Sequence, residues 1–256
     1  MLVSMIETKN LTKSYGSLLA VNNLNITVSS SEIYGFLGPN GAGKTTTIKI
    51  LVGLLKPTSG TALINGIDVM KEPLKTKTLI GYIPDEPLIY PKLTGREFLS
   101  FIADIFEIPF NYAKKKIDDL LDLFSLTDRS NTLIETYSHG MKQKLVFSAA
   151  LLHDPEVLIM DEPTVGLDPQ SAKLVKDIMR ELANNGKTIF MSTHILEIAE
   201  KMCSRVGIIN GGALIAEGTI YELREKTHDK AGDLEELFIE LTGGEDTKDL
   251  IKSLSS

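Results

Sequence analysis

The 256-residue sequence contains no tryptophan and a single cysteine, Cys203. One cysteine cannot form an internal disulfide, and a chain of this length without a cysteine framework is typical of a reducing compartment. The sequence also lacks any continuous run of about 18 to 20 apolar residues, the length that a membrane-spanning helix needs. Residues 1–7 have neither the basic segment nor the long apolar stretch of a secretory signal. We therefore expect a cytosolic chain that is neither secreted nor membrane-spanning.

An excess of basic residues is missing as well. The chain has 27 Lys and Arg against 34 Asp and Glu, which gives a formal net charge of -7. Proteins that hold nucleic acid by its phosphate backbone present a basic face, so we expect no nucleic-acid partner. Apolar residues make up 43% of the chain, which is enough for a sizeable core.

Segments with strand-like and helix-like patterns alternate along much of the chain. Strands are predicted at 5–9, 24–28, 33–37, 157–160, 188–192 and 206–210, and helices at 45–55, 169–184 and 195–203. Between about Thr94 and Leu152 only helical spacing occurs. The alternation predicts a mostly parallel sheet covered by helices and interrupted by a helical insert. A charged tail with one amphipathic segment, 234–241, follows Gly218.

A glycine-rich turn lies between the predicted strand 33–37 and the predicted helix 45–55. It matches the phosphate-binding pattern G-x-x-x-x-G-K-[ST]. Glycine permits backbone conformations in which consecutive N–H groups point at phosphate oxygens. The Lys44 ammonium can reach the terminal phosphates, and the Thr45 hydroxyl can ligate magnesium. We predict a nucleotide site formed by Gly38, Asn40, Gly41, Ala42, Gly43, Lys44, Thr45 and Thr46.

Polar side chains follow two of the predicted strands at their carboxyl ends, where ligands gather in a parallel sheet. Asp161 is expected to face the phosphate loop and complete a magnesium site. Glu162 is then placed to orient or deprotonate the attacking water. His194 is expected at the same edge, in contact with the terminal phosphate. Alone, an acidic strand end or a histidine is usually structural, but the phosphate loop favours catalytic roles for Glu162 and His194.

Together these residues resemble the ATP-binding cassette family in order and spacing, from about Ile6 to Gly218. Tyr15 resembles the aromatic residue that stacks on adenine in this family, although a lone tyrosine is more often part of a core. Asp168 lies in a Gly-Leu-Asp sequence that resembles the loop contacting the opposing subunit.

The resemblance implies an α/β fold: a P-loop NTPase (RecA-like) core with an N-terminal antiparallel β subdomain and an inserted α-helical subdomain. The expected ATPase domain covers 1–218, with the α/β core at 1–86 and 156–218 and the helical subdomain at 87–155. A helical tail is expected at 219–256.

The signature of the family, commonly Leu-Ser-Gly-Gly-Gln, reads Tyr-Ser-His-Gly-Met at 137–141 and so departs at three of five positions. Ser138 and Gly140 keep the hydroxyl and the open backbone that grip a terminal phosphate, and the helix predicted after them directs its N-terminus at that phosphate. This form resembles a branch of export-type ATPases that pair with separate membrane subunits.

A second departure is Asp85, which stands where the family usually has glutamine. A carboxylate can still approach magnesium, directly or through water, but it is shorter than glutamine and adds charge beside anionic phosphates. We expect Asp85 to contribute to the metal site together with Thr45 and Asp161.

The resemblance further implies the cofactors ATP and Mg²⁺ and two kinds of partner. A second cassette, identical or different, would complete each ATP site with Ser138 and Gly140, and closure on ATP would drive transport. A separate transmembrane permease subunit would hold the chain on the inner face of the cell membrane, with Tyr90 to Leu93 as part of the contact surface.

Other interpretations remain open at this point. A soluble ABC ATPase acting on the ribosome or in DNA repair is disfavoured, because no second cassette, charged linker or long coiled coil occurs in the sequence. A small-molecule P-loop kinase would not need the signature at 137–141. A degenerate regulatory cassette, which binds ATP without turnover, is suggested by Asp85 and the altered signature. A neighbouring gene with about six hydrophobic spans would favour the transporter.

Overall fold

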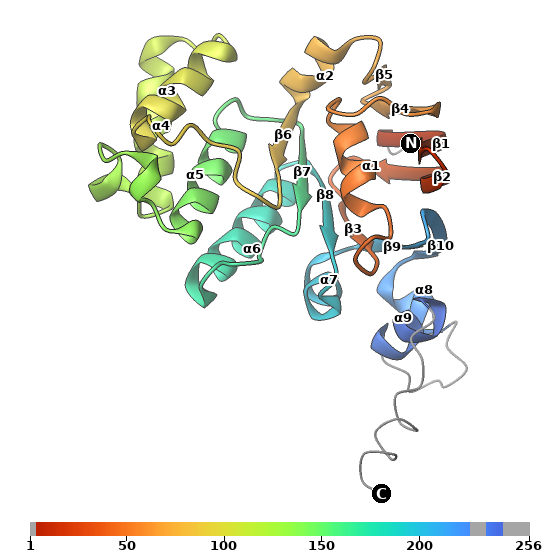
Figure 1. Ribbon diagram of the computed structural model, residues 1–256. Coiled ribbons are helices and arrows are strands. Elements are labelled where there is room, and N and C mark those ends of the chain that lie inside the picture. Colours follow the sequence, from red (N-terminus) through yellow and green to blue (C-terminus); the bar gives the residue numbers. More distant parts are fainter. Residues whose placement is uncertain (1–3, 226–233, 243–256) are drawn as a thin grey trace, which may run out of the picture.

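A six-stranded sheet and a four-stranded sheet form the centre of the molecule. The computed structural model describes residues 4–225 and 234–242 (Figure 1). The larger sheet has the strand order β10-β9-β3-β8-β7-β6, parallel throughout except for the antiparallel pair β9 and β10. Its strands are β3 (Ile33–Leu37), β6 (Ile80–Ile83), β7 (Val157–Asp161), β8 (Thr188–Thr193), β9 (Arg205–Asn210) and β10 (Ala213–Gly218). This confirms the predicted α/β class.

Both faces of the larger sheet are buried, because alternate residues of its central strands pack into two separate cores. In β7, Leu158 and Met160 join a core formed with helices that precede and follow this strand in the chain. Val157 and Ile159 point the other way, into a core shared with the smaller sheet. Consecutive strand residues face opposite sides, so a strand covered on both sides must be apolar throughout.

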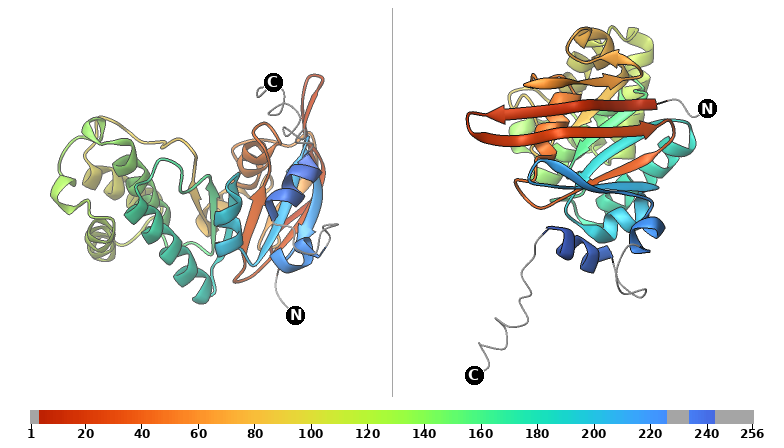
Figure 2. Two further views of the ribbon diagram at one scale, coloured as in Figure 1. Left: turned by 90° about the horizontal axis from the view of Figure 1, so that it is seen from below. Right: turned by 90° about the vertical axis from the view of Figure 1, so that its right-hand side faces the viewer.

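The smaller sheet is antiparallel and has the order β2-β1-β4-β5. Figure 2 shows β1 and β2 as a long hairpin across one side of the molecule. Helix α1 packs between this sheet and β7. The elements are β1 (Ser4–Tyr15), β2 (Leu18–Ser29), β4 (Ser59–Ile64), β5 (Ile67–Asp68) and α1 (Lys44–Leu51).

Three helices form a lobe beside the larger sheet: α3 (Gly95–Ile105), α4 (Phe110–Leu123) and α5 (His139–Leu151) (Figure 1). Helix α3 begins at a capping box, in which Thr94 and Glu97 each accept a hydrogen bond from the other's backbone N–H. Short 3-10 turns, Thr127–Arg129 and Ile134–Thr136, connect α4 to α5.

The remaining helices are α2 (Pro73–Leu79), α6 (Pro169–Asn184), α7 (Leu196–Met202), α8 (Ile220–Arg224) and α9 (Leu234–Thr242). Leu237 of α9 is buried against the core beneath the larger sheet. The predicted tail 219–256 thus contains two helices in its described part, while 226–233 and 243–256 lie outside the described residues.

The predicted helix 45–55 is too long at its C-terminal end, since α1 ends at Leu51. Gly53 has φ +72, and its N–H bonds to Ile50 O while the N–H of Leu54 bonds to Lys49 O. This pair of bonds around a left-handed glycine is the Schellman termination. The prediction overlooked Gly53 because the apolar spacing continues past it.

Candidate functional site

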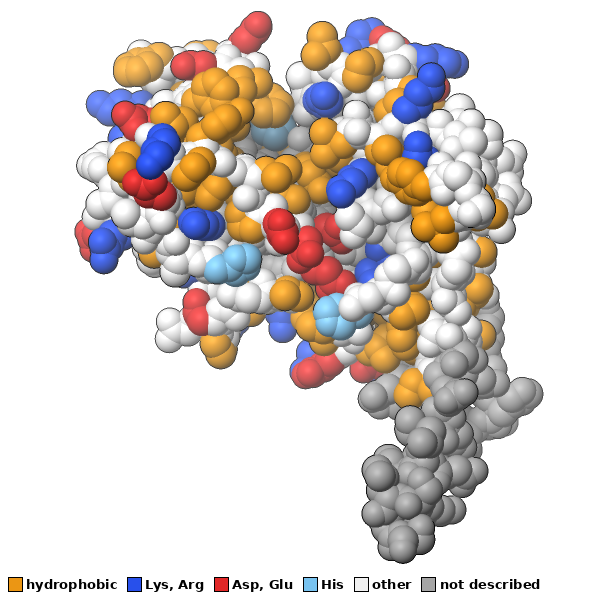
Figure 3. Space-filling model, in the orientation of Figure 1, with side chains coloured by type: hydrophobic (Ala, Val, Ile, Leu, Met, Phe, Trp, Pro, Cys, Tyr) orange, Lys and Arg blue, Asp and Glu red, His pale blue; other side chains and the backbone are white. Residues whose placement is uncertain are grey.

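A pocket of about 400 Å³ lies at the carboxyl ends of β3 and β7, where parallel sheets bind ligands. Figure 3 shows acidic side chains gathered near the middle of this face, between two histidines. The lining includes most of the predicted nucleotide and metal residues: Tyr15, Asn40, Gly41, Gly43, Lys44, Thr45, Thr46, Asp85, Asp161 and Glu162. Five further residues that the sequence did not single out also line it: Leu18, Leu19, Ala20, Pro39 and Gly211.

The phosphate loop is shaped by two glycines that tolerate no side chain. A Cβ on Gly38 would lie 2.4 Å from Ile209 O. Gly43, with φ +107, immediately precedes α1, and a Cβ there would lie 2.3 Å from Ala20 O. The loop therefore passes directly against its neighbouring strands. The backbone N–H groups at the start of α1, which have no partner within the helix, are available to an anion.

Lys44 is almost completely buried, and its charge is directed into the site. Its Nζ donates to Gly38 O at 2.7 Å and to Pro39 O at 3.2 Å, and lies 3.7 Å from the Glu162 Oε1. The ammonium group is thus held at the mouth of the loop, beside the acidic strand end.

Glu162 contacts His194 across the ends of β7 and β8. The distance between Glu162 Oε1 and His194 Nδ1 is 2.9 Å. Because an ionised carboxylate can only accept, Nδ1 carries the proton in this contact and Nε2 remains for another partner. The other carboxylate oxygen of Glu162, Oε2, is buried without a hydrogen-bond partner. Glu162 therefore has free acceptor capacity beside a positioned imidazole.

Asp161 is buried at the end of β7, and its Oδ1 accepts a hydrogen bond from Ser192 on β8. Sequence reasoning gave Ser192 no role of its own, although this residue begins the Ser-Thr-His segment that ends in His194. The signal lies in its spacing, because it comes two residues before His194.

Asp85 lies at the rim of the same pocket, after β6. Partial desolvation, followed by the neighbouring carboxylates of Asp161, Glu162 and Glu86, raises the pKa of Asp85, while His139 lowers it. This site thus concentrates negative charge. Within 4–225 and 234–242, no group of three or more His, Cys, Asp or Glu side chains could hold a metal ion by itself. The oxygens of Thr45, Asp161 and Asp85 suit Mg²⁺, which typically binds through few protein ligands together with substrate phosphates and water.

The exposed side chain of Tyr15 lies at the end of the hairpin, 49% accessible, with Leu18 and Leu19 beside it in the pocket lining. Lys13 Nζ lies 5.1 Å from the centre of the Tyr15 ring. Two exposed apolar residues next to a tyrosine offer a flat surface of the kind on which a base can stack. The sequence alone did not identify these two leucines, because the fold decides whether an apolar side chain is exposed.

Ser138 and Gly140 do not line this pocket; they lie at the N-terminus of α5, in the helical lobe. Ser138 caps the helix by accepting from Met141 N. Tyr137 explains one departure from the common signature, because its buried hydroxyl donates to Arg129 O at 2.7 Å. His139 packs against Gly166, where a Cβ would meet the imidazole at 2.7 Å.

Asp168 also lies outside the pocket and caps α6. Its Oδ1 accepts from the N–H groups of Gln170 and Ser171, each at 3.0 Å. Hydrogen bonds from Ser171 hold the pKa of Asp168 below its ordinary value. Lys144 of α5 is 4.0 Å from the carboxylate, so the segment after β7 and the helix after the signature are in contact within one chain.

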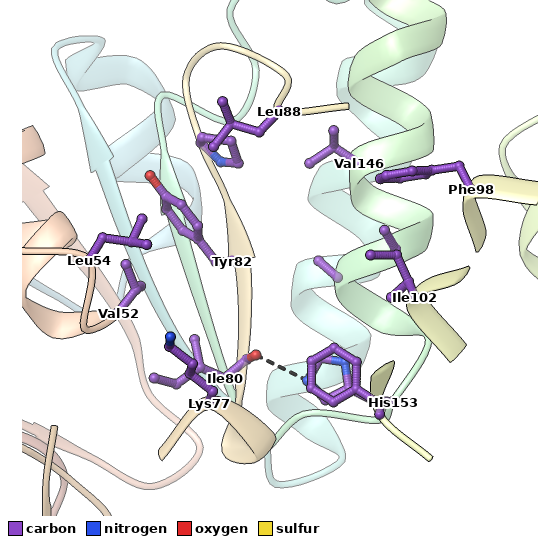
Figure 4. Close-up of a pocket in the computed structure, with 14 residues that line it drawn as sticks. Val52, Leu54, Lys77, Ile80, Tyr82, Leu88, Phe98, Ile102, Val146 and His153 are labelled. Atoms are coloured by element: carbon purple, nitrogen blue, oxygen red, sulfur yellow. Dashed lines mark hydrogen bonds between the residues drawn. The ribbon is translucent and has the colours of Figure 1, made fainter. Parts of the chain in front are cut away.

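A second hollow, which we call the apolar groove, lies between the sheets and the helical lobe. Figure 4 shows Val52 and Leu54 on one wall and Val146, Phe98 and Ile102 on the other. The remaining labelled residues are Lys77, Ile80, Tyr82, Leu88 and His153. His153 lies against Phe106, with ring centres 3.8 Å apart, and its Nε2 is 3.0 Å from Ile80 O.

None of the helices in residues 4–225 and 234–242 has the length and the apolar character needed to cross a membrane.

Residues 21–165 match the protein family described as ABC transporter. The linearmycin resistance ATP-binding protein LnrL of Bacillus subtilis (strain 168) is 41% identical over 219 residues, which cover 86% of this chain and 70% of LnrL. The bacitracin transport ATP-binding protein BcrA of Bacillus licheniformis is 44% identical, over 87% of this chain and 72% of BcrA. The Nod factor export ATP-binding protein I of Burkholderia orbicola (strain AU 1054) is 40% identical, over 88% of this chain and 74% of that protein.

Solved structures agree with these relatives. An ATP-binding subunit of an ABC transporter superposes with a TM-score of 0.88 and 33% identity, covering 93% of this chain and 99% of that one. The dimeric ATP-binding cassette MJ0796, in a post-hydrolysis state bound to ADP and Pi, gives a TM-score of 0.78 and 25% identity, covering 84% and 98%. The chain therefore belongs to the ABC transporter family, as an ATP-binding domain that has the P-loop NTPase fold and hydrolyses ATP.

Proposed function

We propose that this chain drives an ABC exporter by binding and hydrolysing ATP between two cassettes. The observation that carries the proposal is the convergence of Lys44, Asp161, Glu162 and His194 at one edge of the sheet. The three relatives named above are described as proteins of resistance, transport and export, which supports the export direction.

Each residue has a role that follows from its contacts. Lys44 and the loop N–H groups hold the phosphates. Glu162, with a free carboxylate oxygen, accepts the proton of the attacking water or orients it. The Nδ1 of His194 keeps Glu162 in place, which leaves Nε2 to contact the terminal phosphate. Tyr15 stacks on adenine.

Thr45, Asp161 and Asp85 would hold Mg²⁺. When bound, this ion would neutralise part of the phosphate charge. The role of Asp85 follows from its place in the same pocket as Thr45 and Asp161. Its negative charge, which stands in place of an amide, makes the site more dependent on a divalent cation.

A second cassette supplies Ser138 and Gly140 to the ATP of its partner. Support comes from the separation of these residues from the pocket in their own chain and from the dimeric state of MJ0796. Asp168 then lies in the contact between cassettes. The proposed ATPase domain covers 1–218, with the helical subdomain 87–155 presenting the signature.

The apolar groove receives a segment of the permease subunit, which places the chain on the cytoplasmic face of the membrane. The groove offers exposed apolar side chains such as Leu88, 68% accessible, and Leu54, 57% accessible. Continuous exposed apolar surface of this kind marks an interaction site. Tyr90, packed edge-on against Phe101, extends the surface beyond the groove.

Glu162→Gln tests the proposal. The amide keeps the shape of the side chain but cannot take a proton, so hydrolysis with the permease present should fall about 10²-fold to 10⁴-fold while ATP binding persists. Equal, negligible rates in wild type and variant would instead indicate a regulatory cassette. Failure to co-purify with any membrane subunit would contradict the transporter role and favour a soluble ABC ATPase.

A further inference from the structure

Ser192 is fully buried at the carboxyl end of β8, opposite Asp161 of the neighbouring strand β7. Its Oγ donates to Asp161 Oδ1 at 2.5 Å and accepts from the backbone N–H of Glu162 at 3.1 Å. An ionised carboxylate only accepts, so the hydroxyl proton is committed to Asp161 and a lone pair is left for Glu162 N–H. One hydroxyl thus binds two consecutive residues of the proposed catalytic centre.

The contact with Glu162 falls on an unusual backbone. Glu162 has φ +49, the left-handed region that residues with a Cβ rarely adopt. Such conformations persist only where surrounding contacts fix them, and they concentrate at functional sites. Here the N–H of Glu162 is bound by Ser192, and this turn directs the side chain towards Lys44 and His194.

Strand β8 and the residue that follows it therefore hold both the backbone and the side chain of Glu162. Ser192 binds its backbone, and His194, two residues later, binds its side chain. The same serine also fixes one oxygen of Asp161, which orients the rest of that carboxylate towards the pocket that Asp161 lines. Outer partners of this kind set the orientation of metal-binding carboxylates.

We infer that Ser192 is a positioning residue for hydrolysis: its hydroxyl orients Asp161 towards the metal and fixes the backbone from which Glu162 reaches the water. This inference rests on the proposed roles of Asp161 and Glu162. It adds a role for Ser192, the first residue of the Ser-Thr-His segment, beside the role proposed for His194.

Ser192→Ala tests the inference in the full chain. With the permease present, the kcat for ATP hydrolysis should be about 10-fold to 100-fold lower than in wild type. The Mg²⁺ concentration that gives half-maximal activity should be higher. The affinity for the non-hydrolysable analogue AMPPNP, measured by calorimetry, should equal that of wild type in EDTA. Added Mg²⁺ should increase this affinity less than it does in wild type. Ser192→Thr, which keeps the hydroxyl, should recover most of the lost kcat.

Ser130→Ala is the matched control. Ser130 is buried to a similar degree, and its substitution removes one hydrogen bond, from the hydroxyl to Thr127 O. Ser130 lies in the helical lobe, away from the pocket. It should leave kcat and the Mg²⁺ requirement unchanged, and melting temperatures of all variants report folding.

Two results would overturn the inference: wild-type kcat and Mg²⁺ dependence in Ser192→Ala, or an equal loss of AMPPNP affinity with and without Mg²⁺ together with no recovery in Ser192→Thr. If Glu162→Gln hydrolyses ATP as fast as wild type, the proposed function itself fails. If Glu162→Gln is inactive while Ser192→Ala is unaffected, only the role of Ser192 is wrong.

Discussion

The nucleotide pocket and the apolar groove are neighbours that share strand β6, yet they are built in opposite ways. Ile80 and Tyr82 of β6 line the groove, and Asp85, just after the strand, lines the pocket. Burial, followed by the charges of Asp161 and Asp85, raises the pKa of Tyr82 to about 12, which reflects how near this groove residue lies to the carboxylates of the pocket.

The proposed function of the pocket depends on individual polar atoms, whereas that of the groove depends on the shape of an apolar surface. In the pocket, an ammonium, a carboxylate and an imidazole meet at distances of 2.9 to 3.7 Å. In the groove, apolar side chains from the turn after α1 and from β6, α3 and α5 face a common space. Losing one catalytic atom costs more than losing one of several similar contacts. The comparison therefore predicts that a single substitution in the pocket greatly reduces ATP hydrolysis, whereas a single substitution in the groove reduces permease binding only in part.

Lys44→Ala should produce the largest effect. It removes the ammonium that the loop holds beside Glu162, so hydrolysis should fall about 10²-fold to 10³-fold, as for other lost transition-state donors. Phosphate release by the assembled transporter measures it. Lys49→Ala, on the exposed side of the same helix, is the control and should keep wild-type activity. A comparable loss of ATP hydrolysis in both variants would show that the effect comes from a disturbed helix and not from the missing charge of Lys44.

Leu88→Asp should act on the groove alone. A carboxylate on this exposed apolar wall should weaken permease binding about tenfold or more, because it is desolvated on docking. AMPPNP affinity of the full chain should stay unchanged. Leu123→Asp makes the same exchange on α4, outside the groove lining. Permease retention that is equal in the two variants would contradict docking in the groove.

His153→Gln should give the smallest effect, visible as a dependence on pH. Burial lowers the pKa of His153, although the backbone carbonyl of Ile80 opposes the shift. A lowered folded-state pKa means that the unfolded chain takes up the proton first, so stability falls as pH drops below the ordinary value of about 6.5. Between pH 7.5 and 5.5, wild type should therefore lose more of its unfolding free energy than His153→Gln does.

Urea titrations at the two pH values measure this difference. A loss of the same size in His153→Gln would assign the pH dependence to other groups. Gln is chosen because its amide can still donate to Ile80 O while carrying no titratable proton.

Much of the nucleotide pocket was predictable from sequence, because each of its motifs is continuous in the chain. The phosphate loop comes directly before α1, and Asp161 and Glu162 come at the end of an apolar strand. The parallel order of β3, β8 and β7 then brings these strand ends together. By contrast, the apolar spacing that runs on to Leu55 hid the stop signal of Gly53, so the early end of α1 and the place of Leu54 on the wall of the groove were not predicted.

The sequence by itself determined the fold class, the chemistry of the phosphate loop and the identity of the acidic strand end, since these depend on residue types at fixed spacing. Three features depend on tertiary packing: Ser192 bonds both Asp161 and Glu162, Tyr137 anchors the signature through Arg129 O, and the groove meets the pocket along β6. These contacts join segments far apart in the chain. Their partners are therefore set by strand order and helix packing, which no single stretch of sequence contains.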